Sequence, residues 1–64
     1  MKNIIKERRK ERNLSQKDLS MKVNVSRQTI NAIENNKYDP SLSLAFDLAK
    51  ALETTIEQLF ENEE

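Results

Sequence analysis

The chain has 64 residues, of which 11 are Lys or Arg and 11 are Asp or Glu, so its formal net charge is zero. This length allows one domain, expected to span residues 1–64, with a small core, because the chain has two Phe, one Tyr and no Trp. The absence of Cys and His excludes disulfides, thiolate nucleophiles, imidazole bases and the usual zinc sites.

The composition predicts an all-α fold with short connections, because the chain has no Gly and one Pro and is rich in Leu, Ile, Glu, Lys and Gln. A polar first helix is expected at about residues 3–13, with Ile5 as its apolar anchor and arginine stems as additional cover. Asn13 is suited to end this helix, since Asn tolerates the left-handed backbone conformation. Asn24 and Asn36 stand at comparable places later in the chain.

The second predicted helix, at about residues 16–23, has a clear start signal. Ser15 is placed to cap it, and Asp18 three residues later completes a short capping box. Leu14 before the cap and Leu19 after it can form a hydrophobic staple.

The third predicted helix, at about residues 27–35, repeats this start, with Ser26 as its cap. Ile30 and Ile33 share one face at i,i+3 spacing and are expected to point inward. Only residues 24–26 separate this helix from the preceding one. So short a turn forces two helices to cross steeply, which is the helix-turn-helix geometry.

A fourth helix is expected from about residue 41 or 43 to residue 52. Its apolar residues share one stripe and consist of Leu44, Ala45, Leu48, Ala49 and Leu52. The two Thr at residues 54–55 can cap a short fifth helix, and the acidic tail at 61–64 is expected to be frayed. No strand is expected. The core predicted from these helices consists of Ile5, Leu14, Leu19, Val23, Val25, Ile30, Ile33, Leu44, Leu48, Leu52, Ile56 and Leu59.

The charges are distributed unevenly along the chain. Residues 1–37 contain ten Lys or Arg and four Asp or Glu, a balance of +6, whereas residues 38–64 contain one Lys and seven acids, a balance of −6. A single charge on a helix usually does no more than keep the surface solvated. The separation of charge along the whole chain instead favours a basic surface that contacts DNA phosphates and an acidic half that faces away from them.

The predicted outer face of the third helix carries Arg27, Gln28 and Asn31 rather than the Glu and Lys of an ordinary solvated surface. Arg can donate to guanine O6 and N7, and Gln or Asn can pair with adenine N6 and N7. An exposed polar helix would explain any one of these residues. Their occurrence together on one helix favours contact with base edges.

The chain resembles the Cro/C1-type (XRE) helix-turn-helix family over nearly its whole length, in the segments IKERR (5–9), LSQKDL (14–19), VSRQTINAIEN (25–35), PSLSL (40–44), LAKAL (48–52) and IEQLF (56–60). The resemblance implies a five-helix, lambda-repressor-like domain with its helix-turn-helix at the second and third helices. It is closest to short regulators that have no sensor domain. Asn24, Asn36 and Glu53 stand where the family often has Gly.

The resemblance also implies roles for individual residues, with the third helix entering the major groove. The base-contacting residues would be Arg27, Gln28, Asn31 and Ala32. The phosphate-contacting residues would be Gln16, Ser26, Thr29, Asn35 and Lys37. Arg9 and Glu34 match an ion pair of the family that joins the first and third helices, and we assign this pair mainly to structure.

These features predict a cytoplasmic, sequence-specific regulator of transcription, a repressor that binds double-stranded DNA at a palindromic operator. No apolar run approaches the roughly 20 residues of a membrane helix, so no membrane-spanning helix is expected. We also expect no cofactor, metal or small-molecule effector. An enzymatic function is rejected for two reasons. So small a domain is not expected to form a pocket large enough for a substrate, and a chain without Gly cannot form the usual glycine-rich phosphate-binding loop.

The alternative function is an antitoxin-like or protein-interaction module of a two-component operon. Weak salt dependence of DNA binding would favour this alternative.

A homodimer is expected, because one recognition helix makes too few base contacts to specify a single operator. Its interface should lie in the acidic half, since two basic surfaces would repel each other. Leu42, Phe46 and Phe60 have no evident inward role after the core is assigned and are the expected interface residues.

Overall fold

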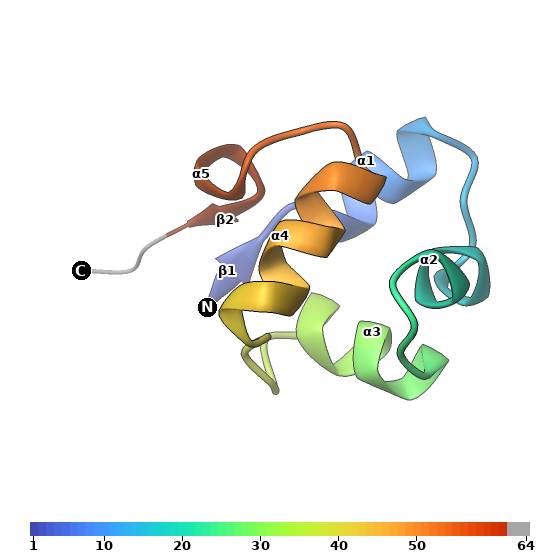
Figure 1. The fold of residues 1–64 in the computed structure, drawn as a ribbon, viewed down its shortest axis with the longest axis horizontal. Coiled ribbons are helices and arrows are strands. Elements are labelled where there is room, and N and C mark those ends of the chain that lie inside the picture. The colour runs from blue at the N-terminus through green and yellow to red at the C-terminus, as the bar shows by residue number, and fades with distance from the viewer. Residues whose placement is uncertain (62–64) are drawn as a thin grey trace.

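The computed structural model describes residues 1–61 of the protein. In these residues, five helices are joined by short turns (Figure 1): α1 (Ile5–Glu11), α2 (Gln16–Lys22), α3 (Arg27–Glu34), α4 (Leu42–Ala51) and α5 (Ile56–Leu59). The predicted five-helix fold is therefore confirmed, with helix ends that differ from the expected ones by one or two residues. No helix among the described residues is long and apolar enough to cross a membrane.

The prediction of no strands is wrong. β1 (Lys2–Asn3) pairs with β2 (Phe60–Glu61) in an antiparallel two-stranded sheet, with Lys2 opposite Glu61 and Asn3 opposite Phe60. The sheet brings the beginning of the chain beside α5, as Figure 1 shows. Glu61, expected to be frayed, is therefore part of the sheet, whereas the rest of the predicted acidic tail lies outside the described residues.

Hydroxyl caps start four of the five helices. The side chains of Ser15, Ser26, Ser41 and Thr55 each accept a hydrogen bond from the backbone N–H three residues later. At α2 the bond is reciprocal, because the Ser15 N–H also donates to Oδ2 of Asp18 over 2.9 Å. These caps satisfy N–H groups that have no partner within the helix, which fixes where each helix begins.

Four helices also end in the same way. The residues after them, Asn13, Asn24, Asn36 and Glu53, have φ angles of 57°, 59°, 61° and 55°. The N–H of the next residue then reaches back five residues to a helix carbonyl, for example from Lys37 to Ala32 over 2.9 Å. This is the Schellman arrangement of helix C-termini. Glu53 adopts it although a glutamate is poorly suited to positive φ.

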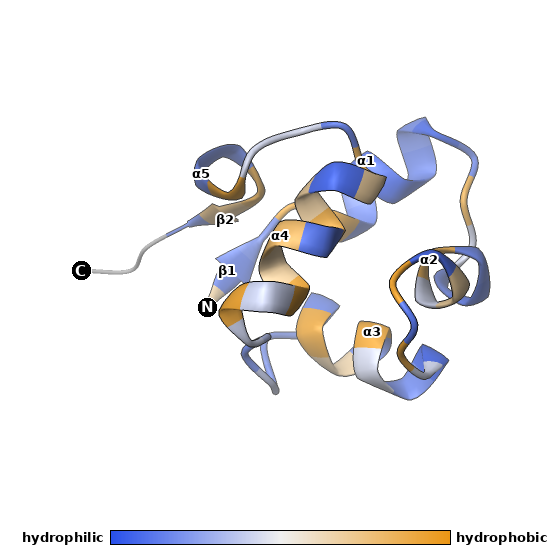
Figure 2. Cartoon of the chain, in the orientation of Figure 1, coloured by the Kyte–Doolittle hydropathy of each residue, from blue (hydrophilic) through white to orange (hydrophobic). Residues whose placement is uncertain are grey.

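The hydrophobic core lies between the helices, and Figure 2 shows the hydrophobic residues of α3 on the side that faces α4. Every predicted core residue is either buried or packed against the buried cluster, so the core assignment is confirmed. Ala45 and Ala49 complete the buried side of α4, which allows the helix backbone to approach its neighbours closely. The fully buried large side chains are Ile5, Leu19, Ile30, Ile33, Leu48, Leu52 and Leu59.

The structure corrects the assignment of Phe60. This side chain is only 8% exposed and belongs to the core cluster, because β2 turns it toward the helices. The expectation that Phe60 lacks an inward role is therefore wrong. Leu42 and Phe46 differ from it, since they are 69% and 52% exposed on α4.

Candidate nucleic-acid interface

The turn between α2 and α3 is held tightly by the backbone. The Val25 N–H donates to the Ser20 carbonyl over 3.1 Å, with Asn24 between them in the left-handed conformation. Ser20 is itself buried, and its hydroxyl donates to the Lys17 carbonyl over 2.7 Å. The small side chain at this position therefore lets the turn pack closely against α2, and α3 leaves the turn in a fixed direction.

The two faces of α3 differ sharply in chemistry. Ile30 and Ile33 are at most 1% exposed and attach the helix to the core. Arg27, Gln28 and Asn31 are exposed on the other side, where their side chains face away from the core. Ala32, which is partly buried, adds only a methyl group to this exposed face.

At the start of α3, Ser26 and Thr29 form a local hydroxyl pair. Their hydroxyl oxygens are 2.9 Å apart, and the Thr29 N–H donates to Oγ of Ser26 over 3.1 Å. Ser26 is exposed and Thr29 half-buried, so the pair lies at the edge of the exposed face of the helix. Both residues can offer a hydroxyl to a phosphate only if part of this local hydrogen bonding is rearranged.

At the end of α3, Asn35 donates from Nδ2 to two acceptors of Asn31, the carbonyl oxygen over 2.9 Å and Oδ1 over 3.2 Å. The Asn31 carboxamide is thereby held with its oxygen toward Asn35. Lys37 follows the helix and is exposed, with its backbone fixed by the hydrogen bond to Ala32. The two residues expected to clamp phosphates, Asn35 and Lys37, thus lie at the same end of the helix.

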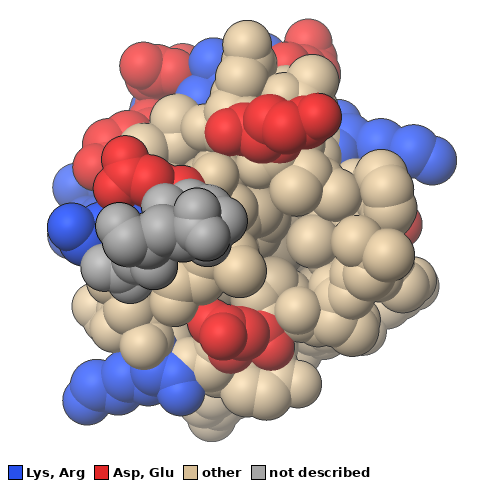
Figure 3. Space-filling view, turned by 90° about the vertical axis from the view of Figure 1, so that its left-hand side faces the viewer, with Lys and Arg blue, Asp and Glu red and all other residues tan. Residues whose placement is uncertain are grey.

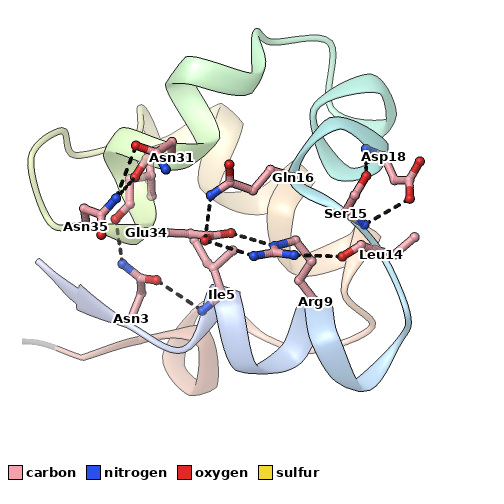
Figure 4. A network of polar contacts seen from close by, with 11 residues as sticks. Asn3, Ile5, Arg9, Leu14, Ser15, Gln16, Asp18, Asn31, Glu34 and Asn35 are labelled. Carbon is pink, nitrogen blue, oxygen red and sulfur yellow. Dashed lines mark hydrogen bonds and ion pairs between the residues drawn. The ribbon is translucent and has the colours of Figure 1, made fainter.

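A buried ion pair connects α1 with α3, as Figure 4 shows. Nε of Arg9 lies 2.8 Å from Oε2 of Glu34, and Nη2 of Arg9 lies 3.3 Å from Oε1, so the guanidinium faces the carboxylate in a two-point contact. Nη1 of Arg9 also donates to the Leu14 carbonyl over 2.9 Å. The side chains of Arg9 and Glu34 are 9% and 3% exposed, so this charge pair is an internal support of the helix-turn-helix.

Gln16 is part of the same network. Its Nε2 donates to Oε1 of Glu34 over 3.1 Å, which links the first residue of α2 to the last residue of α3. Figure 4 shows that the amide oxygen of Gln16 points away from this bond. The structure therefore fixes the direction of the side chain that was expected to contact a phosphate.

Asn3 is a supporting residue that sequence reasoning missed. Its Nδ2 donates to the Ile33 carbonyl over 2.9 Å and to Oδ1 of Asn36 over 3.3 Å, while its Oδ1 accepts from the Ile5 N–H over 3.1 Å. It therefore satisfies the N–H of the first residue of α1 and holds the end of α3. No local pattern indicates this role, because the partners at the end of α3, Ile33 and Asn36, are distant in the sequence.

Asp18, at the start of α2, has a pKa below its ordinary value. The Ser15 N–H donates to the Asp18 carboxylate, and this bond, with the Ser15 hydroxyl, holds the pKa of Asp18 below its usual range. Within residues 1–61, no group of His, Cys, Asp and Glu side chains could hold a metal ion.

The candidate interface therefore consists of exposed hydrogen-bonding side chains on α3, a helix whose other face is fixed in the core.

The sequence identifies the protein family to which this fold and this exposed helix belong. The sequence profile of the family described as Helix-turn-helix (HTH_3) matches residues 5–59. The chain belongs to this helix-turn-helix family. The Cro/C1-type resemblance is thereby confirmed. This helix-turn-helix protein is a DNA-binding regulator of transcription, and its family is not enzymatic.

Two relatives match nearly all of the helix-turn-helix protein. An HTH-type transcriptional regulator of Methanocaldococcus jannaschii is 57% identical over 60 residues, which are 94% of this chain and 91% of the relative. The HTH-type transcriptional regulator YgzD of Bacillus subtilis is 45% identical over 64 residues, which are 100% of this chain and 97% of the relative.

Two solved structures have the same fold. The restriction-modification controller protein C.AhdI from Aeromonas hydrophila has a TM-score of 0.81 and 28% identity, over 88% of this chain and 85% of that one. A chain of the SinR protein/SinI protein complex has a TM-score of 0.82 and 27% identity. It matches 91% of this chain, which spans 57% of that chain. The five-helix, lambda-repressor-like fold is confirmed by these matches.

Proposed function

We propose that this helix-turn-helix protein is a repressor that binds a palindromic operator as a homodimer, with α3 of each protomer in the major groove. The observation that carries the proposal is the exposed face of α3, where Arg27, Gln28 and Asn31 are free of the core while Ile30 and Ile33 fix the helix. Repression then results from occupation of the operator. The proposal implies a cytoplasmic protein, since the prokaryotes that carry the relatives keep their DNA in the cytoplasm.

Base readout is assigned to the first turns of α3. Arg27 is suited to a bidentate contact with guanine, and Gln28 to a bidentate contact with adenine. Asn31 has its Oδ1 engaged by Asn35, so we assign its Nδ2 to a base acceptor such as guanine O6 or thymine O4. The Ala32 methyl is assigned to a thymine methyl group.

Phosphate contacts are assigned to the residues on either side of the recognition face. Gln16 has one N–H bonded to Glu34, which leaves the second N–H of its amide for a phosphate oxygen. Ser26 and Thr29 are assigned to one flanking phosphate, and Asn35 with Lys37 to another. Contacts of this kind set the register of a protein on DNA without reading its sequence.

The homodimer supplies a second recognition helix. Two exposed apolar side chains of α4, Leu42 and Phe46, are the proposed interface residues, whereas the buried Phe60 is no longer among them. In Figure 3, the side of the molecule with α5 and the start of α4 shows a largely uncharged surface between scattered charges. Two-fold symmetry would place the half-site centres about 10–10.5 base pairs apart.

Selection of binding sites from a random DNA pool tests this proposal. The expected result is an inverted repeat with this spacing and a one-dimer complex, whose affinity falls linearly with the logarithm of salt concentration. An unrelated or asymmetric consensus bound by one protomer would contradict the homodimer. An affinity for DNA that is low and independent of sequence would contradict the operator, and would favour the alternative of a protein-interaction module.

A further inference from the structure

Two side-chain carboxamides at the end of α3 have an orientation that the backbone fixes. Nδ2 of Asn35 lies 2.9 Å from the Asn31 carbonyl oxygen, and a carbonyl oxygen can only accept a hydrogen bond. The same Nδ2 lies 3.2 Å from the carboxamide of Asn31, which must therefore turn its acceptor, Oδ1, toward Asn35. Figure 4 shows both hydrogen bonds. The orientation of Asn31 thus follows from a backbone group that cannot turn.

This orientation decides which group Asn31 offers to a ligand. The oxygen and the nitrogen of a planar carboxamide point in different directions, so Nδ2 of Asn31 points away from Asn35. Among residues 1–61, this nitrogen donates to no other group. Because Asn31 is exposed, its N–H donors are available on the outer face of α3.

We propose that Asn35 determines base specificity without touching a base, because it fixes the side of Asn31 that faces the major groove. The inference rests on the proposed function and deepens the roles given there to these two residues. An asparagine that turns freely can present either its oxygen or its nitrogen to a base edge. Asn31, held by Asn35, presents its nitrogen. This favours a keto base, with guanine O6 or thymine O4 as acceptor, over the amino group of adenine or cytosine.

The phosphate contact proposed for Asn35 is compatible with this role. Its NH₂ group has two hydrogens, and in the free protein both are directed at Asn31. A phosphate can take the hydrogen that bonds the Asn31 carbonyl, because that oxygen also accepts the Asn35 backbone N–H over 3.1 Å and stays satisfied. The other hydrogen then remains on Oδ1. Asn35 would in this way connect a phosphate of the DNA to a side chain that reads a base.

The hydrogen bond between these two exposed side chains should matter more in the complex than in the free protein. Water competes for Nδ2 and Oδ1 on a free surface. Bound DNA removes much of this water, and a hydrogen bond is stronger where water is excluded. The effect of Asn35 should therefore appear in base preference rather than in the stability of the domain.

The test compares operators that differ only at the base pair that Asn31 contacts, which is the pair whose preference Asn31→Ala relaxes. The parent should bind the keto base about tenfold more tightly than the amino base at this position. Asn35→Asp is nearly isosteric but has no hydrogen to donate to Oδ1, so this preference should fall to about twofold or less. Asn35→Ala removes the same hydrogen bond without adding a charge and should give the same loss.

Asn36→Asp is the matched control, because it adds the same charge one residue later. Oδ1 of Asn36 accepts a hydrogen bond from Asn3, an acceptor that an aspartate retains, and aspartate tolerates the positive φ at this position. This variant should weaken binding to all operators alike, through repulsion of phosphates, and keep the preference for the keto base. Circular dichroism and urea denaturation check that each variant is folded and about as stable as the parent.

The outcomes separate this inference from the proposed function. Loss of the preference in both Asn35 variants, with the preference of Asn36→Asp intact, supports the inference. An unchanged preference in the Asn35 variants would overturn the role of Asn35 and leave Asn31 as a base-reading residue. A parent that prefers the amino base would overturn the assigned orientation. If Asn31→Ala changes no base preference, the readout assigned to Asn31 in the proposed function is wrong, and the inference fails with it.

Discussion

Gln16 and Glu34 are joined by a hydrogen bond of 3.1 Å that connects the start of α2 with the end of α3. Glu34 is at the same time the partner of Arg9, and its side chain is 3% exposed. The side chain proposed to contact a phosphate is therefore attached to a buried carboxylate that also holds Arg9. Any change to this carboxylate should affect both the stability of the fold and the direction of Gln16.

The first prediction concerns that carboxylate. Glu34→Gln should lower the free energy of unfolding by about 3–5 kcal/mol, because it leaves the Arg9 charge buried without its counter-charge. Glu53→Gln is the control, since Glu53 pairs with Arg12 at the surface and is 71% exposed, so its loss should cost at most about 1 kcal/mol. Urea denaturation followed by circular dichroism measures both. Equal effects of the two substitutions would contradict the internal role of the Arg9–Glu34 pair.

The second prediction concerns the core. Ile30→Ala and Leu48→Ala should each cost about 2–5 kcal/mol, because both side chains are fully buried and the domain is too small to close the cavity. That loss approaches the whole stability expected of a domain of this size. Met21→Ala, at an exposed position of α2, should change stability by no more than about 0.5 kcal/mol. Thermal unfolding of the three variants compares them directly.

The third prediction separates base readout from phosphate contact. Arg27→Ala and Gln28→Ala should each cost about 1–3 kcal/mol on the selected operator and relax the preference at one or two base pairs. Lys37→Ala should instead weaken binding to all sequences alike and reduce the salt slope by about one unit. Titrations of matched and mismatched operators at several salt concentrations measure both effects. An Arg27→Ala protein with unchanged affinity and preference would contradict the role assigned to α3.

The fourth prediction concerns pH. The folded state lowers the pKa of Asp18, chiefly through the Ser15 N–H, so the ionised carboxylate stabilises the fold above the unfolded pKa of about 3.9. This contribution is lost as the pH falls through the lower pKa of the folded state. The difference in Tm between the parent and Asp18→Asn should therefore shrink on acidification. Asp47→Asn is the control, because Asp47 is exposed and does not cap a helix, so this variant shows how Tm changes when an ordinary surface carboxylate is removed. A difference that stays constant to low pH would contradict the capping role.

The sequence predicts the parts of this fold that depend on neighbouring residues. The capping box of Ser15 and Asp18 and the left-handed conformation of the asparagines follow from side-chain chemistry within one turn of the chain. The inward positions of Ile30 and Ile33 follow from helical spacing. The exposed face of α3 could be predicted for the same reason, since fixing one face of a helix in the core determines which residues remain outside.

The features that sequence reasoning missed depend on residues from distant parts of the chain. The strands are only two residues long, so neither β1 nor β2 has a recognisable periodicity, and only their pairing across the termini reveals them. The same pairing buries Phe60. The conformation of Glu53 was indicated only by the family resemblance, which often has Gly there, because a glutamate gives no local signal for a left-handed backbone. Such contacts can be predicted only when it is known which helices and strands pack against one another.

The last prediction concerns Arg8 in α1 and Arg12 directly after it, whose stems the sequence suggested only as apolar cover. Nη2 of Arg8 donates to the carbonyls of Leu52 and Glu53 over 2.9 and 3.1 Å, and Nε of Arg12 donates to the Leu52 carbonyl over 2.9 Å. One cation from α1 and one from the residue that follows it therefore close the end of α4, where helix carbonyls lack partners and carry partial negative charge.

Replacing either guanidinium should destabilise the domain measurably. Arg8→Lys and Arg12→Lys each keep a positive charge but lose the forked donor, and each should cost about 1–2 kcal/mol. Lys10→Ala, an exposed cation of the same helix, should change stability by less than about 0.5 kcal/mol. Because Arg8 and Arg12 share the Leu52 carbonyl, the double variant should depart from the sum of the single effects. Strict additivity in a double-mutant cycle, measured by urea denaturation, would show that the two arginines act independently at the end of α4.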